Sequence, residues 1–192
     1  WNGKPYVHGR KYVPNGINSN YSVTQTHILG IRALVNDNSF ANLSYSLLRD
    51  EFDSYLYEDP TDIRHIGPEQ SSLVGSNAFL VGGNDLYQNH NVTQTHTVVA
   101  DYTNQINRVH QVKTGLQVRL HSLDNRGFGI ERSFRTGFLP QVSPDVFSDN
   151  SLTTSPKEFS AYIQDKMEYT NLIVNAGLRF DYFDPDYLVP ID

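Results

Sequence analysis

Histidine and carboxylate side chains are the residues of this sequence best suited to chemistry. Imidazole binds transition metals and moves protons near neutral pH, and the sequence has seven histidines. Four of them fall in segments with strand-like alternation: His27, His96, His110 and His121. Their spacing matches neither the i, i+4 pattern of a helical metal site nor a clustered ligand motif. We therefore expect these histidines on a wet sheet face or in loops, and we predict no metal site.

The segment of residues 57–91 carries carboxylates that invite comparison with a calcium site. Ca²⁺ takes several oxygen ligands, often from flexible loops, and this segment contains Asp59, Asp62 and Glu69. These carboxylates lack the regular spacing of an EF-hand loop, so we expect a solvated acidic loop. The side chains that we regard as candidate ligand contacts in this loop are Tyr57, Asp59, Asp62 and Tyr87.

Enzyme chemistry finds no support in the residue types or their spacing. The sequence has no cysteine, which excludes disulfides, thiolate metal sites and a cysteine nucleophile. No Gly-x-Ser-x-Gly motif marks a hydrolase nucleophile. The glycines at 82–83 and 127–129 lack the strand-to-helix context of a phosphate-binding loop. We predict that the protein is not an enzyme, has no catalytic residue and uses no cofactor.

Charge and hydropathy restrict the possible partners. The formal net charge is −6 and there is no basic run, which argues against binding to nucleic acid. No window approaches the ~18 apolar residues of a membrane-spanning helix, although a strand of a membrane barrel alternates and needs no such run. The chain begins at Trp1 and ends at Asp192 in a segment rich in Pro and Asp. We interpret residues 1–192 as an internal stretch of a longer protein.

A period of two along residues 112–121 predicts a strand with two unlike faces. One face carries Val112, Thr114, Leu116, Val118 and Leu120. The opposite, mostly polar face carries Lys113, Gly115, Gln117, Arg119 and His121. Residues 172–182 repeat this alternation and put Arg179 on their polar side.

Six such strand segments, joined in pairs by short turns, account for most of the sequence. The predicted hairpins are residues 21–56, 92–121 and 158–183. The long connections that separate them are residues 57–91 and 122–157. The pentapeptide Val-Thr-Gln-Thr-His opens the first hairpin at residues 23–27 and the second at residues 92–96. We predict an all-β fold, an antiparallel meander of about six strands, with the alternation of short turns and long loops typical of a large transmembrane β-barrel.

Asp165 does not fit this alternation. If Tyr169 pairs with Leu172 across a tight turn, Asp165 shares the apolar face of its strand with Ile163 and Met167. A carboxylate that faces lipid is unfavourable. A bulge that turns Asp165 to the polar face would remove the conflict.

Residues 156–185 contain two consecutive strand motifs that point to a family. The first is Tyr162-Ile163-Gln164-Asp165 and the second is Gly177-Leu178-Arg179-Phe180-Asp181. This pair resembles the barrel of TonB-dependent receptors, where an aromatic-x-Gln-Asp strand precedes a Gly-Leu-Arg-aromatic-Asp strand. Residues 55–60 and 105–115 look like the branch of the family that carries a carboxypeptidase-regulatory-like domain.

The resemblance implies a barrel in the bacterial outer membrane that takes up an unidentified nutrient ligand. Its partners would be outer-membrane lipid and the TonB complex, the latter through a plug region outside residues 1–192. The cations that we expect to line the lumen are Lys113, Arg119 and Arg179. The alternative is a soluble β-sandwich that binds carbohydrate through Tyr55, Tyr57 and Tyr87. A sandwich requires a second sheet packed on the apolar face, whereas a barrel leaves that face to lipid.

Overall fold

The computed structural model describes residues 1–66, 79–144 and 149–186. Within these residues the regular structure is β-strand, with short 3-10 turns and no α-helix. The 3-10 turns are His8–Arg10, Pro14–Gly16 and Phe134–Thr136. No helix in this part of the chain is long and apolar enough to cross a membrane. The all-β, antiparallel class predicted from the alternation is confirmed.

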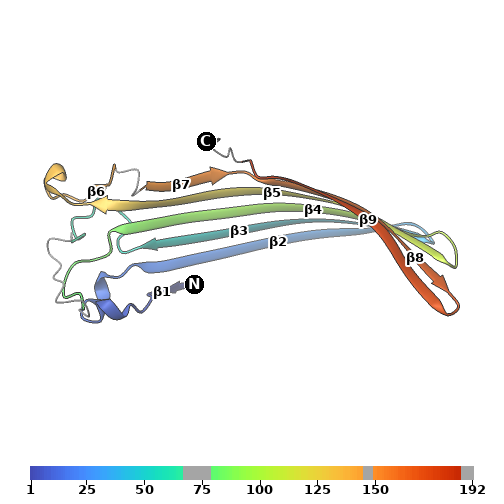
Figure 1. Ribbon diagram of the computed structural model, residues 1–192, viewed down its shortest axis with the longest axis horizontal. Coiled ribbons are helices and arrows are strands. Elements are labelled where there is room, and N and C mark those ends of the chain that lie inside the picture. Colours follow the sequence, from blue (N-terminus) through green and yellow to red (C-terminus); the bar gives the residue numbers. More distant parts are fainter. Residues whose placement is uncertain (67–78, 145–148, 187–192) are drawn as a thin grey trace, which may run out of the picture. The chain divides into compact units, whose positions relative to one another are not determined.

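In the described part of the chain, nine strands form one antiparallel sheet, which is not closed. Figure 1 shows these strands. Their bounds are β1 Asn2–Gly3, β2 Ser19–Asn36, β3 Ser39–Tyr55, β4 Tyr87–Gln105, β5 His110–Glu131, β6 Gln141–Val142, β7 Asp149–Thr154, β8 Lys157–Tyr169 and β9 Leu172–Asp184. The order across the sheet is β1-β2-β3-β4-β5-β8-β9, and the short β6 and β7 both pair with β5. Each of the three predicted strand pairs is therefore a pair of neighbouring strands.

Asparagine side chains shape the two short turns that join β2 to β3 and β4 to β5. In the first turn, the Asn36 carboxamide oxygen accepts a hydrogen bond from the Asn38 amide at 2.9 Å. In the second, the Asn107 oxygen accepts from the Val109 and His110 amides at 2.8 and 3.0 Å. Such side-chain bonds satisfy turn amides that have no strand partner. They fix where β5 begins and hence which of its residues share a face.

Strand β5 is longer than the sequence predicts, because it continues past His121 to Glu131. The added stretch contains Gly127 and Gly129, which suggest a loop. A Cβ atom at Gly127 would collide with the Tyr87 hydroxyl, so this glycine leaves room for the Tyr87 side chain of β4 beside β5. Part of the predicted connection 122–157 is therefore strand. Residues 67–78 and 145–148 of the two predicted connections lie outside the described residues.

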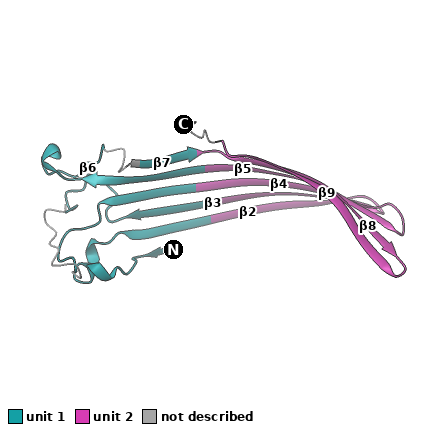
Figure 2. Cartoon of the chain, in the orientation of Figure 1, with its two compact units in different colours: residues 1–24, 50–92, 123–153 teal, residues 25–49, 93–122, 154–192 magenta. Residues whose placement is uncertain are grey.

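The chain divides into two compact units, each assembled from three segments (Figure 2). Unit 1 comprises residues 1–24, 50–92 and 123–153, and unit 2 comprises residues 25–49, 93–122 and 154–192. Only two hydrophobic residues in the described part of the chain are buried, Ile17 and Ile130, and both belong to unit 1. Unit 2 is thus a sheet whose apolar side chains are not gathered into a core.

The pairing of β8 with both of its neighbours is uninterrupted. Pairs run from Leu120 opposite Lys157 to His110 opposite Met167, and from Lys157 opposite Asp184 to the end of the hairpin. The bulge that would turn Asp165 inward is therefore not present. Asp165 stays on the apolar side and is 2.6 Å from Nδ1 of His110, which lies on the same side of β5. This hydrogen bond gives the carboxylate a polar partner, which reduces the conflict without a change of register.

The continuous register puts large apolar side chains on one side of β5, β8 and β9. We call this set the apolar face: Leu116, Phe159, Ile163, Leu178, Phe180 and Tyr182. Each of them is exposed, and Leu178 reaches 80%. Fully burying a side chain of this size is worth about 1.5–3 kcal/mol. Adjacent exposed apolar side chains of this size are typical of a surface that meets a protein partner or a membrane.

Candidate functional site

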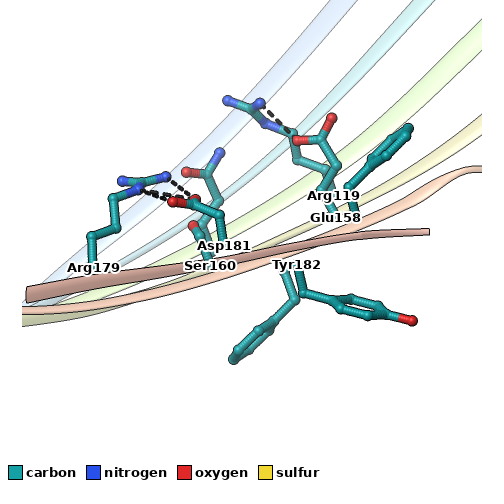
Figure 3. Close-up of a pocket in the computed structure, with 9 residues that line it drawn as sticks. Arg119, Glu158, Ser160, Arg179, Asp181 and Tyr182 are labelled. Atoms are coloured by element: carbon teal, nitrogen blue, oxygen red, sulfur yellow. Dashed lines mark hydrogen bonds and ion pairs between the residues drawn. The ribbon is translucent and has the colours of Figure 1, made fainter. Parts of the chain in front are cut away.

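The opposite side of β5, β8 and β9 contains the three cations that the sequence assigns to a lumen. We call this side the polar face: Lys113, Gln117, Arg119, Glu158, Ser160, Tyr162, Arg179 and Asp181. It follows from the period of two, because successive side chains along a strand project to opposite sides of the sheet. Figure 3 shows Arg119, Glu158, Arg179 and Asp181 on one side of the ribbons and Tyr182 on the other.

Arg119 lies at the centre of a group of hydrogen bonds between β5 and β8. Its Nη1 donates to Oε2 of Glu158, directly opposite in the register, at 3.0 Å. The Gln117 carboxamide, with its oxygen turned toward Arg119, accepts from the guanidinium at 2.7 and 2.8 Å. His121 continues the group, with Nε2 3.4 Å from the other Glu158 oxygen and Nδ1 3.0 Å from the Thr95 hydroxyl. The Arg119 guanidinium therefore has hydrogen-bond acceptors on both β5 and β8.

Lys113 belongs to a second group that reaches across to β4. Its ammonium is 4.0 Å from Asp101 Oδ1 and 5.7 Å from the centre of the Tyr162 ring. The Tyr162 hydroxyl donates to the same Asp101 oxygen at 2.6 Å. Gly115 lies directly opposite Tyr162, and its lack of a side chain leaves room for the ring. Lys113 therefore meets an acid on a neighbouring strand.

Arg179 is paired within its own strand. Its Nε donates to both carboxylate oxygens of Asp181 at 2.9 Å, and its Nη2 is 2.8 Å from Oδ1. A shallow hollow on β5, β8 and β9 is lined by this pair, by the Arg119–Glu158 pair and by Ser160 (Figure 3). The surface offers alternating cations, anions and hydroxyls. It can hydrogen-bond a polar solute or water, but each cation already has a carboxylate partner.

The loop candidates belong to unit 1, where the two aspartates act within tight turns. The Asp59 carboxylate accepts from the Thr61 amide and hydroxyl at 2.8 and 2.7 Å, and these bonds lower the pKa of Asp59. The Asp62 carboxylate accepts from the Arg64 guanidinium at 2.6 Å and from the Arg64 amide, which lowers the pKa of Asp62 to about 2. Glu69, the third carboxylate of the calcium hypothesis, lies outside the described residues.

Tyr57 is brought into a cluster with two residues that the sequence did not single out. The Arg64 guanidinium lies over the Tyr57 ring at 4.1 Å, and the His65 ring meets it edge-on at 5.1 Å. His65 is 1% exposed, and this burial lowers the pKa of its imidazole. Tyr87 begins β4, and its carbonyl accepts a hydrogen bond from the Asn18 carboxamide at 2.7 Å. The four loop candidates therefore do not form a single array among the described residues.

Sequence reasoning missed the anionic partners of the polar face. Asp101 lies on β4 and Glu158 on β8, each distant in sequence from the cation that it meets. The alternation of β4 and β8 predicts that Asp101 and Glu158 lie on the polar side of the sheet. It does not predict which residue of the neighbouring strand each of them meets. No family model, curated protein or solved structure matches this chain.

Proposed function

We propose that this chain is part of the β-barrel of a TonB-dependent receptor in the bacterial outer membrane. In this proposal the apolar face contacts lipid, and the polar face lines the lumen through which a nutrient ligand is taken up. The observation that carries it is the pairing of two chemically opposite faces on a single sheet. Large apolar side chains are exposed on one side of β5, β8 and β9, and the other side carries the hydrogen-bonded pairs Arg119–Glu158 and Arg179–Asp181.

The dimensions of the hairpin β8–β9 support the membrane reading. Each of these strands has 13 residues, more than the ~9–11 residues that a tilted strand needs to cross a bilayer. Their turn is short, and the connections between the hairpins are long. That order is typical of outer-membrane barrels, in which tight turns face the periplasm and long loops face the medium.

The same surface argues against a carbohydrate-binding sandwich. A sandwich buries one side of each sheet under a second sheet about 10 Å away. The described residues form one sheet, and Leu116 and Leu178 are exposed rather than packed. Of the aromatic residues considered for carbohydrate binding, Tyr57 packs against Arg64 and His65, and Tyr87 lies at the start of β4.

Cysteine labelling on intact cells tests this proposal, because the sequence has no cysteine of its own. We choose Ile63→Cys in the long connection, where the side chain is 74% exposed, and Asn171→Cys in the β8–β9 turn. With the full-length protein in a Gram-negative cell, a membrane-impermeant maleimide should label Ile63→Cys directly. It should label Asn171→Cys only after the outer membrane is permeabilised. Equal labelling of both variants on intact cells, or their recovery in the soluble fraction, would contradict the proposal.

A further inference from the structure

Two acidic side chains of β3 and one histidine of β4 converge in unit 1. Glu51 and Asp53 are two residues apart on β3, so they project to the same side of that strand. His90 lies near the start of β4. One ligand atom from each of the three residues lies within 4.8 Å of the others. The closest approach is 2.5 Å, between His90 Nδ1 and Asp53 Oδ1.

The three side chains lie in an open hollow rather than on a flat surface. Besides Glu51, Asp53 and His90, its lining consists of Tyr55, Glu58, Gln88, Asn89 and Phe128. Several of these residues offer further oxygen ligands, including the Glu58 carboxylate. His90 has a side-chain exposure of 45% and Asp53 of 25%, so an ion can enter from solvent.

Side-chain movements of about 1 Å bring the three residues to the spacing of one small divalent ion. Zinc binds imidazole nitrogen at ~2.0–2.1 Å and carboxylate oxygen at ~2.0–2.2 Å, so ligand atoms around one tetrahedral ion lie about 3.4 Å apart. The three atoms here all lie within 4.8 Å of one another, so their widest separation shortens by up to about 1.4 Å. The His90 and Asp53 atoms, now 2.5 Å apart, separate by about 0.9 Å to admit the ion.

The ligand types distinguish between metals. Calcium and magnesium prefer sites made only of oxygen, whereas imidazole favours zinc and the later transition metals. A thiolate cannot compete for the ion, because the chain has no cysteine. One imidazole and two carboxylates form a set of three protein ligands, which leaves a position for water or for Glu58.

We propose that Glu51, Asp53 and His90 bind a divalent transition-metal ion of the zinc class. The ion takes the place of the hydrogen bond between His90 Nδ1 and Asp53, and the Nδ1 proton moves to Nε2 of the same imidazole ring, so that Nδ1 is free to bind the metal. The ion joins the end of β3 to the start of β4, so it closes the base of the connection between Tyr55 and Tyr87. No metal site was predicted from the sequence, because His90 is far from Glu51 and Asp53 in the chain and lies outside any ligand motif.

Titration of the metal-free protein with Zn²⁺ alone at pH 7.5 tests this site. Calorimetry should give one site whose affinity falls at least tenfold in Asp53→Asn and in His90→Gln. The matched control is Asp50→Asn, because Asp50 projects to the other side of β3 and accepts a hydrogen bond from Thr24 at 2.5 Å. The control variant should bind Zn²⁺ as the unchanged protein does.

Two further measurements keep the test informative if a substitution disturbs folding. In the unchanged protein, the Zn²⁺ affinity should fall as the pH is lowered from 7.5, because protons compete with the metal for its ligand atoms. Visible absorption of bound Co²⁺ should report a nitrogen ligand that His90→Gln removes. Absence of Zn²⁺ uptake by the unchanged protein, equal affinity in Asp53→Asn and Asp50→Asn, or a preference for Ca²⁺ over Zn²⁺ would overturn the proposal.

Discussion

Arg119 and Glu158 face each other directly across β5 and β8, with Nη1 of the guanidinium 3.0 Å from Oε2 of the carboxylate. Opposite charges on directly opposed residues stabilise a strand pair, and like charges there destabilise it. The two side chains are 45% and 37% exposed, so solvent screens their attraction. This pair contributes specificity of register more than stability.

Reversal of the charge on Glu158 tests this pair. Glu158→Lys should lower the free energy of unfolding, because it puts two cations opposite each other and removes the acid beside His121. The coupling energy from a double-mutant cycle with Arg119→Glu should be only about 0.2–1 kcal/mol, as for exposed pairs. Urea unfolding of the four proteins gives this value. Strict additivity of the two substitutions would show that the pair contributes no interaction energy.

Gly115 should tolerate substitution poorly. A Cβ atom there would be 2.5 Å from the Tyr162 ring and 2.6 Å from Asp101 Oδ1, so Gly115→Ala must displace the ring from its acid. We expect a loss of about 1–3 kcal/mol in the free energy of unfolding, the usual cost of overpacking. Gly30→Ala on β2 is the matched control, because nothing lies within 4 Å of a Cβ at that position. An equal effect of both substitutions would refute the role of Gly115.

His65 should make the loop around it sensitive to pH. Burial lowers the pKa of His65 in the folded state. The nearby Arg64 cation lowers this pKa further, whereas Asp59 and Asp62 raise it by a smaller amount than burial lowers it. The opened loop therefore binds a proton first as the pH falls below ~6.5, the ordinary value for histidine. Neutral His65 therefore makes its full contribution to the stability of the folded loop above that pH. This contribution is lost as the pH falls toward the lowered pKa of His65 in the folded state.

Hydrogen exchange of the loop amides measures this effect. After correction for intrinsic rates, protection of the His65 amide, which donates to the Asp62 carbonyl, should be weaker at pH 5.5 than at pH 7.5. His65→Phe should remove this dependence, because phenylalanine fills the buried position with an aromatic ring that cannot take up a proton. The same pH dependence in the variant would exclude His65 as its origin.

The alternation of residues 112–121 was sufficient to predict both faces of β5, because a strand turns successive side chains to opposite sides. It could not give the partner of Arg119, since that depends on the register with β8. The bulge considered for Asp165 is absent, because His110 supplies a partner across the strands instead. The length of β5 was underestimated because Gly127 and Gly129 indicate a loop when contacts with neighbouring strands are unknown.

The cluster of Glu51, Asp53 and His90 was not foreseen for a related reason. Two of its members follow the alternation of β3, but nothing in the local sequence indicates that β4 lies beside β3 in the sheet. Pairing between successive hairpins is a long-range contact, and it decides which polar side chains meet. The types of residue on each face were predictable, but their partners were not.

Leu116 and Gln117 provide the most direct test of the central claim, because they are adjacent on β5 and project to opposite faces. Each is replaced by cysteine, Leu116→Cys or Gln117→Cys, and labelled with a fluorophore in the membrane-inserted protein. Residues 1–192 contain no other cysteine, and any cysteine elsewhere in the full-length protein is first replaced by serine. Our account predicts that a quencher attached to lipid chains acts on the label at residue 116, and that a water-soluble quencher acts on the label at residue 117. Shielding of residue 116 from both quenchers, or its quenching from water alone, would contradict it.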